Sequence, residues 1–322
     1  MFRIAREFVR PDTQKPTSVA LGLFDGIHLG HYEVLSKALE NKECSPCVFT
    51  YTISGELPAN KQNYRRLMAD DYKCELLKRM GFELVVMPDF DAFKDLAPEE
   101  FVEEMLINRM GAKELTCGYD FTFGKMGKGN TDLLCKIAEK HGVKVNIISP
   151  ISQEGIPISS TRIRRAVMDG NMELAAELLG RRFSICLPVE HGNQLGRLLE
   201  FPTINQIFPD RHIIPCHGVY STIVKVDDNL YGGVTNVGLK PTIGTDRPLA
   251  ETYILNYSGD LYGKQVEVYF FRFLRPEVRF VTINLLKEQI ARDKESVEKE
   301  YEANIFAVMK QKQNGEELIT EL

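Results

Sequence analysis

Short apolar runs alternate with amphipathic segments throughout the first half of this chain. The runs have the length of buried strands, and the segments between them place apolar residues at helical spacing. Strands that alternate with helices form a parallel sheet, and ligands bind at the carboxyl ends of its strands. We therefore predict a Rossmann-like α/β domain. Its expected strands cover residues 19–23, 47–51, 83–87, 115–117 and 143–148, and its expected helices cover 32–39, 70–80, 98–110 and 132–141.

The pattern changes near residue 180. Two short helices, 160–168 and 171–179, are expected to close the first domain, and strand-like segments separated by turn residues follow. Such a series is typical of an antiparallel barrel or sandwich. A chain of 322 residues fits two domains, which we place at 1–182 and 183–322. The second is predicted to have strands at 183–189, 218–226, 230–237, 251–256 and 265–273, followed by helices at 283–292 and 294–310.

The charge balance narrows the class of protein. The chain has 40 Lys and Arg against 45 Asp and Glu, a net charge of −5, without long basic runs. This argues against nucleic-acid binding. No apolar stretch is long enough for a membrane span, and charges interrupt the N-terminus too often for a secretion signal. We expect a cytoplasmic protein with no membrane partner and no obligatory protein partner.

The cysteines fit a reducing compartment. There are seven, an odd number scattered along the chain, which favours reduced thiols over a disulfide framework. Cys44 and Cys47 form a C-x-x-C pair, for which a redox or zinc role is the alternative to ordinary buried thiols. A second pair is missing, so we favour ordinary thiols.

Residues 22–31, Gly-Leu-Phe-Asp-Gly-Ile-His-Leu-Gly-His, form a motif at an expected strand-to-helix turn. Amides at a helix N-terminus favour phosphate, and Gly26 and Gly30 let a ligand approach the backbone. His28 and His31 share one helix face and can donate hydrogen bonds to phosphate oxygens. Neither a P-loop nor a Gly-x-Gly-x-x-Gly motif is present. The alternatives are two surface histidines or a zinc pair, for which no further ligand cluster lies nearby in the sequence.

A second phosphate-binding element is expected where the helix at 160–168 begins. Ser160 and Thr161 can cap the helix and bind phosphate oxygens, and Arg162 or Arg164 can neutralise a pyrophosphate leaving group. The alternative is a helix cap followed by a basic surface. Combined with the first motif, this element favours nucleotidyl transfer.

The two motifs, G-x-F-D-G-x-H-x-G-H and I-S-S-T-x-I-R, resemble those of the nucleotidyltransferase superfamily that moves AMP from ATP to a phosphate acceptor. Residues 118–124, Gly-Tyr-Asp-Phe-Thr-Phe-Gly, narrow the resemblance to the adenylyltransferase module of bacterial bifunctional riboflavin kinase/FAD synthetases. The resemblance implies ATP binding by Gly22, Phe24, Asp25, Gly26, His28, His31, Ser160, Thr161 and Arg164. It implies flavin binding by Asp120, Phe121 and Phe123.

The second half resembles the riboflavin-kinase module of the same family, with an antiparallel β-barrel. Gly196-Arg197 and Phe201-Pro202-Thr203-Ile204-Asn205 match its signature, and further matches follow in family order as far as residue 293. Without the resemblance, a turn with proline would be the simpler interpretation of this segment. The resemblance implies an ATP contact at Gly196, Mg²⁺-ATP ligands at Thr203 and Asn205, a general base at Glu251 and a flavin contact at Arg275.

Two reactions on one chain follow from this resemblance. The second domain would phosphorylate riboflavin with ATP to give FMN, while Glu251 takes the proton of the ribityl 5′-hydroxyl. The first domain would join FMN to AMP from a second ATP, giving FAD and pyrophosphate. His28 and His31 would position the phosphates and stabilise charge during direct attack.

Two departures from the family pattern leave alternatives open. Glu200 stands where the family usually has glycine, and it could repel ATP, so an FMN adenylyltransferase with weak or lost kinase activity is the second hypothesis. Residues 51–55 replace a usual Asp-Pro-His-Pro run, so contacts of 51–66 with flavin or adenine stay unassigned. A non-catalytic flavin- or nucleotide-binding regulator conflicts with the intact His28, His31 and Glu251. Adenylyl transfer to another acceptor, such as a pantetheine phosphate, gives the second domain no role.

Overall fold

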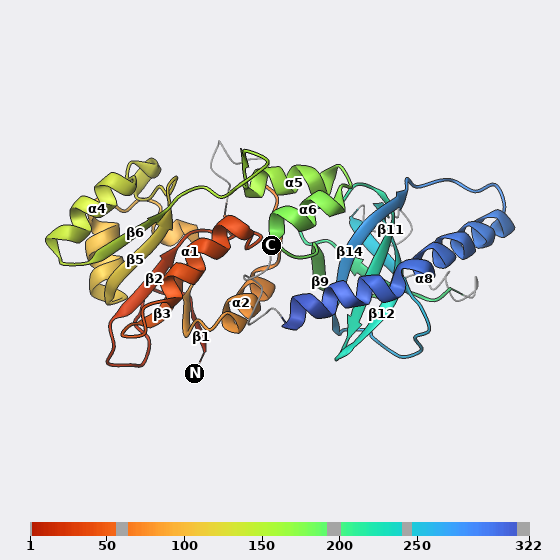
Figure 1. Cartoon of the computed structure of the whole chain (residues 1–322), viewed down its shortest axis with the longest axis horizontal. Coiled ribbons are helices and arrows are strands. Elements are labelled where there is room, and N and C mark those ends of the chain that lie inside the picture. Colours follow the sequence, from red (N-terminus) through yellow and green to blue (C-terminus); the bar gives the residue numbers. More distant parts are fainter. Residues whose placement is uncertain (1, 56–63, 192–200, 240–246, 314–322) are drawn as a thin grey trace. The chain divides into compact units, whose positions relative to one another are not determined.

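The computed structural model describes residues 2–55, 64–191, 201–239 and 247–313. The chain divides into two compact units (Figure 1). The first comprises Met1–Tyr64 and Asp70–Ser159, and the second comprises Arg65–Ala69 and Ser160–Leu322. This division by contacts begins the second unit before residue 183, and the boundary of the two functional domains at 182/183 stays a prediction.

The first unit contains the predicted parallel sheet. Its strands lie in the order β1-β4-β3-β2-β5-β6, and every neighbouring pair is parallel. Strands β2, β3 and β4 consist almost entirely of buried residues, which is why they stand out in the sequence as apolar runs. β1 was not predicted, because it is short and mostly exposed. The strands are β1 Arg3–Ala5, β2 Thr17–Leu21, β3 Ser45–Phe49, β4 Leu84–Val86, β5 Ala112–Gly118 and β6 Lys144–Ile148.

Local sequence signals explain where the helices of this unit begin. His28 caps α1 and Asn130 caps α4, each accepting a backbone N–H three residues further on. The helix predicted at 98–110 becomes a π-helix after its first turn. Its buried residues are Phe101, Val102, Met105 and Leu106, so one face of this helix packs into the core. The elements are α1 Leu29–Leu39, α2 Asp70–Arg79, α3 Pro98–Glu100, the π-helix Phe101–Arg109, α4 Thr131–Lys140 and the hairpin of β7 Ser152–Gln153 and β8 Ile156–Pro157.

The second unit contains the predicted antiparallel barrel. Its strands lie in the order β10-β13-β12-β11-β14-β9, with antiparallel neighbours. The backbone N–H of Glu190 donates to the carbonyl oxygen of Asn205 over 2.8 Å, so the chain after β9 meets β10 and nearly closes the sheet. The elements are α5 Ser160–Met168, α6 Met172–Leu179, β9 Ser184–Pro188, β10 Thr203–Ile207, β11 Gly218–Val226, β12 Asn229–Leu239, β13 Pro248–Ile254 and β14 Gln265–Arg275.

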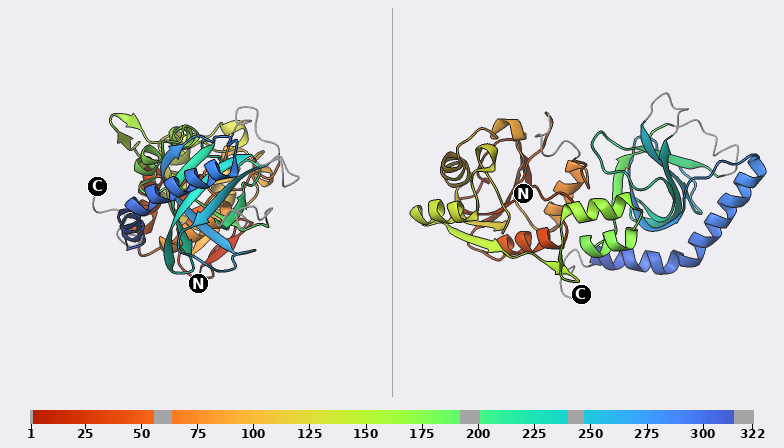
Figure 2. Two further views of the ribbon diagram at one scale, coloured as in Figure 1. Left: turned by 90° about the vertical axis from the view of Figure 1, so that its right-hand side faces the viewer. Right: turned by 90° about the horizontal axis from the view of Figure 1, so that it is seen from above.

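One helix, α8 (Ile283–Gln313), packs along β11 and β12 (Figure 2). The prediction of two helices, 283–292 and 294–310, is wrong in this respect. No glycine or proline stands between residues 283 and 313 to end a helix, and the charged Asp293 is buried rather than at a break. Among the residues that the structure describes, none of the helices combines the length and the apolar character needed to cross a bilayer.

The seven cysteines all lie in the described ranges, and none forms a disulfide there. Cys44 and Cys47 are buried. Burial raises the pKa of the Cys47 thiol to about 12, so the thiolate that binds metal or attacks a substrate is scarce. These two residues therefore fit the interpretation of ordinary buried thiols.

Candidate active sites

The turn between β2 and α1 has an unusual backbone. Phe24 and Ile27 have φ angles of 51° and 38°, and Gly26 lies between them at 90°. A left-handed backbone at a residue with a side chain costs about 1–3 kcal/mol, so the surroundings must hold it in place. Strain of this kind clusters at functional sites. The turn also stands at the carboxyl end of a central parallel strand, where such sheets bind ligands.

The structure brings the two motif histidines together. Their rings stack with centroids 3.6 Å apart and an angle of 17° between planes. His28 Nδ1 accepts the backbone N–H of His31 over 3.3 Å, so in the neutral ring the proton is on Nε2. The Phe24 ring meets His31 edge-on at 5.4 Å. Because Phe24 and His28 are almost fully buried, both rings are held in place.

Two glycines of the motif leave room for these rings. A Cβ atom at Gly22 would lie 3.0 Å from the Phe24 ring, and one at Gly30 would lie 3.3 Å from the His28 ring. Both distances are tighter than ordinary contacts. Glycine at 22 and 30 therefore spares these rings a tight contact, besides allowing any close approach of a ligand.

Side chains from outside the motif form hydrogen bonds to the backbone of this turn. The carbonyl oxygen of Leu23 accepts the Thr50 hydroxyl over 2.8 Å and the Lys73 ammonium group over 3.4 Å. Sequence reasoning missed Lys73, since a lysine in an amphipathic helix normally faces solvent. No local signal in α2 could have revealed it.

The expected flavin residues divide into two kinds. Phe123 is 5% exposed and packs on Phe101 with ring centroids 5.7 Å apart, so it belongs to the core. Phe121 stacks on Phe123 at 5.7 Å and is half-buried, while Asp120 is exposed. Phe121 and Asp120 are thus accessible to a ligand, and Phe123 supports them. Their contacts with flavin stay a prediction.

The segment that departs from the family pattern is anchored by Asp89. Its carboxylate accepts the backbone N–H of Ser54 over 3.0 Å and the hydroxyl of Thr52 over 3.3 Å. Hydrogen bonds from Ser54 and its neighbours hold the pKa of Asp89 below its ordinary value. The Tyr51 ring packs against Phe90 at 5.4 Å. The backbone of residues 51–54 is therefore held in place although the usual Asp-Pro-His-Pro run of the family is missing.

Ser160, Thr161 and Arg164 lie at the start of α5, as predicted, and α5 belongs to the second unit. Arg164 Nε donates to the carbonyl oxygen of Arg65 in the same unit over 2.6 Å. The approach of these residues to the phosphates at the histidine turn stays a prediction.

The second unit contains a cavity of about 340 Å³ between the barrel and the start of α8. This size suits a small organic molecule. Apolar side chains dominate its wall, with a few convergent polar groups. It is lined by Phe201, Thr203, Val219, Val234, Asn236, Glu251, Tyr253, Arg275, Glu277, Val278, Phe280, Leu286, Ile290 and Asp293.

The expected kinase residues come together on neighbouring strands. In the register of β10 and β13, Asn205 lies opposite Glu251 and Thr203 lies opposite Tyr253. The Thr203 hydroxyl donates to Glu251 Oε1 over 3.3 Å, and both side chains line the cavity. Asn205 is buried beside them. The pairing thus places a carboxylate, a hydroxyl and an amide within one small region.

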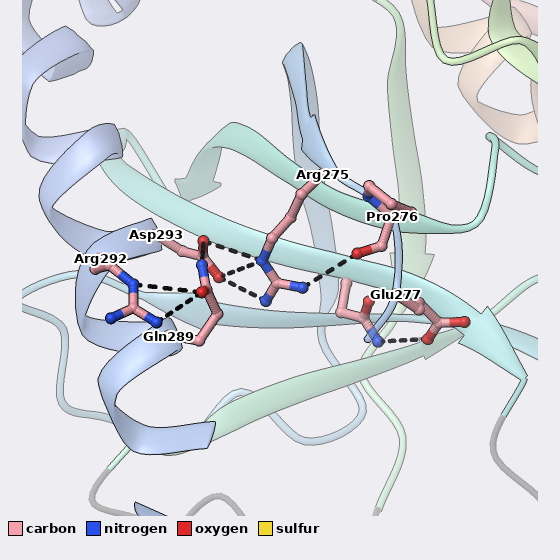
Figure 3. Close-up of polar contacts among 7 residues, drawn as sticks. Arg275, Pro276, Glu277, Gln289, Arg292 and Asp293 are labelled. Atoms are coloured by element: carbon pink, nitrogen blue, oxygen red, sulfur yellow. Dashed lines mark hydrogen bonds and ion pairs between the residues drawn. The ribbon is translucent and has the colours of Figure 1, made fainter. Parts of the chain in front are cut away.

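Arg275 links the end of β14 to α8 (Figure 3). Its Nη2 and Nε atoms lie 2.7 and 3.1 Å from Asp293 Oδ2, and Gln289 Nε2 donates to Asp293 Oδ1 over 2.9 Å. The Arg275 and Asp293 side chains are 19% and 6% exposed. Sequence reasoning assigned no role to Asp293, because a carboxylate on a charged helix resembles a solvated group. The flavin contact expected of Arg275 stays a prediction.

A second carboxylate faces the same cavity. Asn236 Nδ2 donates to Glu277 Oε1 over 3.1 Å. Asn236 lies opposite Glu251 in the register of β12 and β13. A Cβ atom at Gly238 would meet the Glu277 carboxylate, which would have to turn aside to make room.

Some expected residues lie outside the described ranges. These are Gly196, Arg197 and Glu200. The effect of Glu200 on ATP binding therefore stays a question for experiment.

Two family models match the chain in succession. One described as FAD synthetase matches residues 10–162, and one described as riboflavin kinase matches residues 179–301. A curated protein of Escherichia coli (strain K12), described as a bifunctional riboflavin kinase/FMN adenylyltransferase, is 33% identical over 87% of this chain and 91% of its own length. A protein of Bacillus subtilis (strain 168) with the same description is 31% identical over 88% and 92%.

A solved crystal structure resembles this chain over most of its length. It is described as a macrolide-efflux protein from Streptococcus pneumoniae, is 32% identical, and covers 89% of this chain and 95% of its own. Its TM-score is 0.77. That description differs from those of the curated relatives. A fold does not determine a function, so this likeness concerns the fold.

Proposed function

We propose that the two activities of this chain have separate sites, one on each unit's characteristic sheet. The chain belongs to the family of bifunctional riboflavin kinases/FMN adenylyltransferases. The chain phosphorylates riboflavin with ATP to give FMN, and it adenylylates FMN with ATP to give FAD and pyrophosphate. The barrel cavity is assigned to the first reaction and the histidine turn to the second. The observation that carries this assignment is the Thr203–Glu251 pair in the barrel cavity, on a unit separate from the stacked His28 and His31.

In the kinase reaction, Glu251 acts as general base. Its carboxylate takes the proton of the ribityl 5′-hydroxyl while that oxygen attacks the γ-phosphorus of ATP, and the bond from this phosphorus to ADP breaks. The Thr203 hydroxyl, 3.3 Å from Glu251 Oε1, orients the carboxylate. The apolar wall of the cavity would enclose the flavin ring.

Mg²⁺ fits the donors that this site offers. The hydroxyl of Thr203 and the amide oxygen of Asn205 are hard oxygen ligands of the kind that Mg²⁺ prefers, and both lie beside Glu251. When bound with ATP, Mg²⁺ neutralises phosphate charge. The protein groups place the acceptor hydroxyl and its base.

In the adenylyl transfer, an oxygen of the FMN phosphate attacks the α-phosphorus of ATP, and the bond to pyrophosphate breaks. His28 and His31 donate hydrogen bonds to the phosphate oxygens as charge builds on them. The nucleotide binds to the backbone of Gly22, Phe24, Asp25 and Gly26. Ser160, Thr161 and Arg164 hold the pyrophosphate. We propose a cytoplasmic location, because seven scattered cysteines fit a reducing compartment.

The test is a double variant, His28→Ala with His31→Ala. Conversion of FMN to FAD should fall by at least about 10²-fold, since each lost donor to developing charge costs about 10²–10³-fold. Phosphorylation of riboflavin should stay at the wild-type rate. A folded variant in which both reactions fall together, or neither falls, would refute the assignment.

A further inference from the structure

We infer that Lys73 is a positioning residue for the adenylyl-transfer reaction. The inference rests on the proposed role of the histidine turn, and it names the group that holds this turn in place. Lys73 lies on α2, more than forty residues after the motif, and is only 3% exposed. A lysine is buried this deeply only where its ammonium group has partners.

The ammonium group of Lys73 has a complete set of acceptors. Its Nζ atom lies 3.4 Å from the carbonyl oxygen of Leu23, 3.2 Å from Thr50 Oγ1 and 3.2 Å from Asp70 Oδ1. Three N–H donors thus meet three acceptors from three different segments. The Thr50 hydroxyl donates its own hydrogen bond to the same Leu23 oxygen over 2.8 Å. Lys73 and Thr50 therefore form one support beneath a single carbonyl group.

This carbonyl group controls where the turn starts. Leu23 immediately precedes Phe24, the first residue with left-handed backbone. Because the peptide group is planar, fixing the Leu23 oxygen fixes the plane that enters the turn. The strain at Phe24 and Ile27 would otherwise favour relaxation of the segment that presents His28.

The support acts through geometry rather than through net charge. Asp70 lies 3.2 Å from the ammonium group and balances it. We therefore expect loss of Lys73 to lower kcat for adenylyl transfer, with a small effect on the KM for ATP. A displacement of about 1 Å in a reacting group can cost about 10²-fold in rate.

The first variant is Lys73→Met, which keeps the length of the side chain and removes the ammonium group. In the full-length enzyme, kcat for FAD formation from FMN should fall about 10–100-fold, while riboflavin phosphorylation stays unchanged. The matched control is Lys78→Met on the same helix, because Lys78 is 54% exposed. This control should leave both reactions unchanged.

Testing Lys73→Met in a His28→Ala enzyme distinguishes a positioning role of Lys73 from a simple loss of folded protein. If Lys73 acts by placing His28, then Lys73→Met should have little further effect in a His28→Ala enzyme, because residues that act as one unit are not additive. A smaller folded fraction would instead lower kcat by the same factor in both backgrounds. Equal factors, or a wild-type kcat for Lys73→Met, would overturn the inference.

Thr50→Val keeps the inference testable if Lys73→Met does not fold. It removes only the hydroxyl that shares the Leu23 oxygen, and it should lower kcat for FAD formation by a smaller factor, again without additivity to His28→Ala. An additive loss or an unchanged kcat would count against the support. The proposed function fails by a different result, in which His28→Ala itself leaves FAD formation intact.

Discussion

The histidine turn and the barrel cavity are built in opposite ways. The turn draws its groups from ten consecutive residues, 22–31, and depends on strained backbone held from below. The cavity draws its groups from separate strands and a helix, between Phe201 and Asp293, and depends on strand register and one ion pair. A site of the first kind is contained in a short sequence motif. A site of the second kind exists only after the barrel has formed.

This difference decides how each site should respond to mutation. Changes around the turn should act through the backbone and affect FAD formation alone. Changes around the cavity should act through hydrogen bonds and the ion pair between β14 and α8, and affect FMN formation alone. The two activities of one chain thus serve as internal controls for each other.

The largest expected effect is that of Glu251→Gln. Removing a general base costs about 10²–10⁴-fold, so riboflavin phosphorylation should fall by that factor. FMN adenylylation should be unaffected, since Glu251 lines the barrel cavity, which is assigned to the kinase reaction. Initial rates with riboflavin and with FMN as separate substrates check both statements. Substantial kinase activity in the variant would remove Glu251 from the mechanism.

Next in size is Asp293→Ala, which leaves Arg275 without its carboxylate in a mostly buried position. Breaking a buried ion pair costs about 3–5 kcal/mol, so the free energy of unfolding of the barrel unit should fall by about that amount. The matched control is Arg272→Ala, on the same strand, whose ion pair with Glu300 on α8 is 43% and 36% exposed. It should cost about 0–1 kcal/mol. Hydrogen exchange of barrel amides in urea measures both, and equal losses would contradict this account of α8.

A smaller effect is expected for Gly22→Ala. The added methyl group would meet the buried Phe24 ring at 3.0 Å, and the ring cannot move away without shifting the turn. FAD formation should slow several-fold, with wild-type FMN formation. Gly30→Ala, with 3.3 Å to the His28 ring, should have a weaker effect of the same kind. A larger effect of Gly30→Ala than of Gly22→Ala on FAD formation, or a change in the kinase rate, would mean that packing around these glycines does not determine the shape of the turn.

The smallest effect concerns acid stability of the first unit. Glu114 on β5 is 3% exposed. Burial alone would raise its pKa, but hydrogen bonds from Asn146, Asn41 and Lys144 outweigh burial and hold the pKa below its ordinary value of 4.5. Such a carboxylate stabilises the fold above the unfolded-state pKa, and this contribution is lost as the pH falls through the folded-state pKa.

Glu114→Gln should therefore weaken the acid sensitivity of the first unit. Hydrogen exchange of β5 and β6 amides between pH 6 and pH 3 measures this, with the barrel amides as reference. An unchanged pH dependence would show that the hydrogen bonds do not favour the charged form.

The sequence predicted most of the fold for physical reasons that the structure makes plain. Buried parallel strands are apolar along their whole length, and antiparallel strands are separated by turn residues, so both sheets could be anticipated. β10 was not assigned as a strand, because its polar Thr203, Asn205 and Gln206 interrupt the apolar pattern. The break expected at Asp293 was wrong because the partner of this carboxylate, Arg275, is eighteen residues away.

The sites were predictable to the extent that they are local. The pairing of His28 with His31 follows from helical spacing, and the motifs pointed to Glu251 and Thr203 through resemblance. Lys73 could not be found in this way. Its role depends on a carbonyl group fifty residues earlier, which sequence spacing does not reveal.

Mixing two variants, each impaired in one of the two reactions, tests the separation of the sites most directly. Glu251→Gln should make no FAD from riboflavin and ATP, because it makes no FMN. His28→Ala with His31→Ala should make FMN and stop there. Combined in one vessel with riboflavin, ATP and Mg²⁺, the two variants should produce FAD at a rate that rises with the amount of each. The opposite outcome is that the mixture forms no FAD although the Glu251→Gln protein still converts added FMN. That result would contradict the claim that the two sites work independently and that released FMN passes from one to the other.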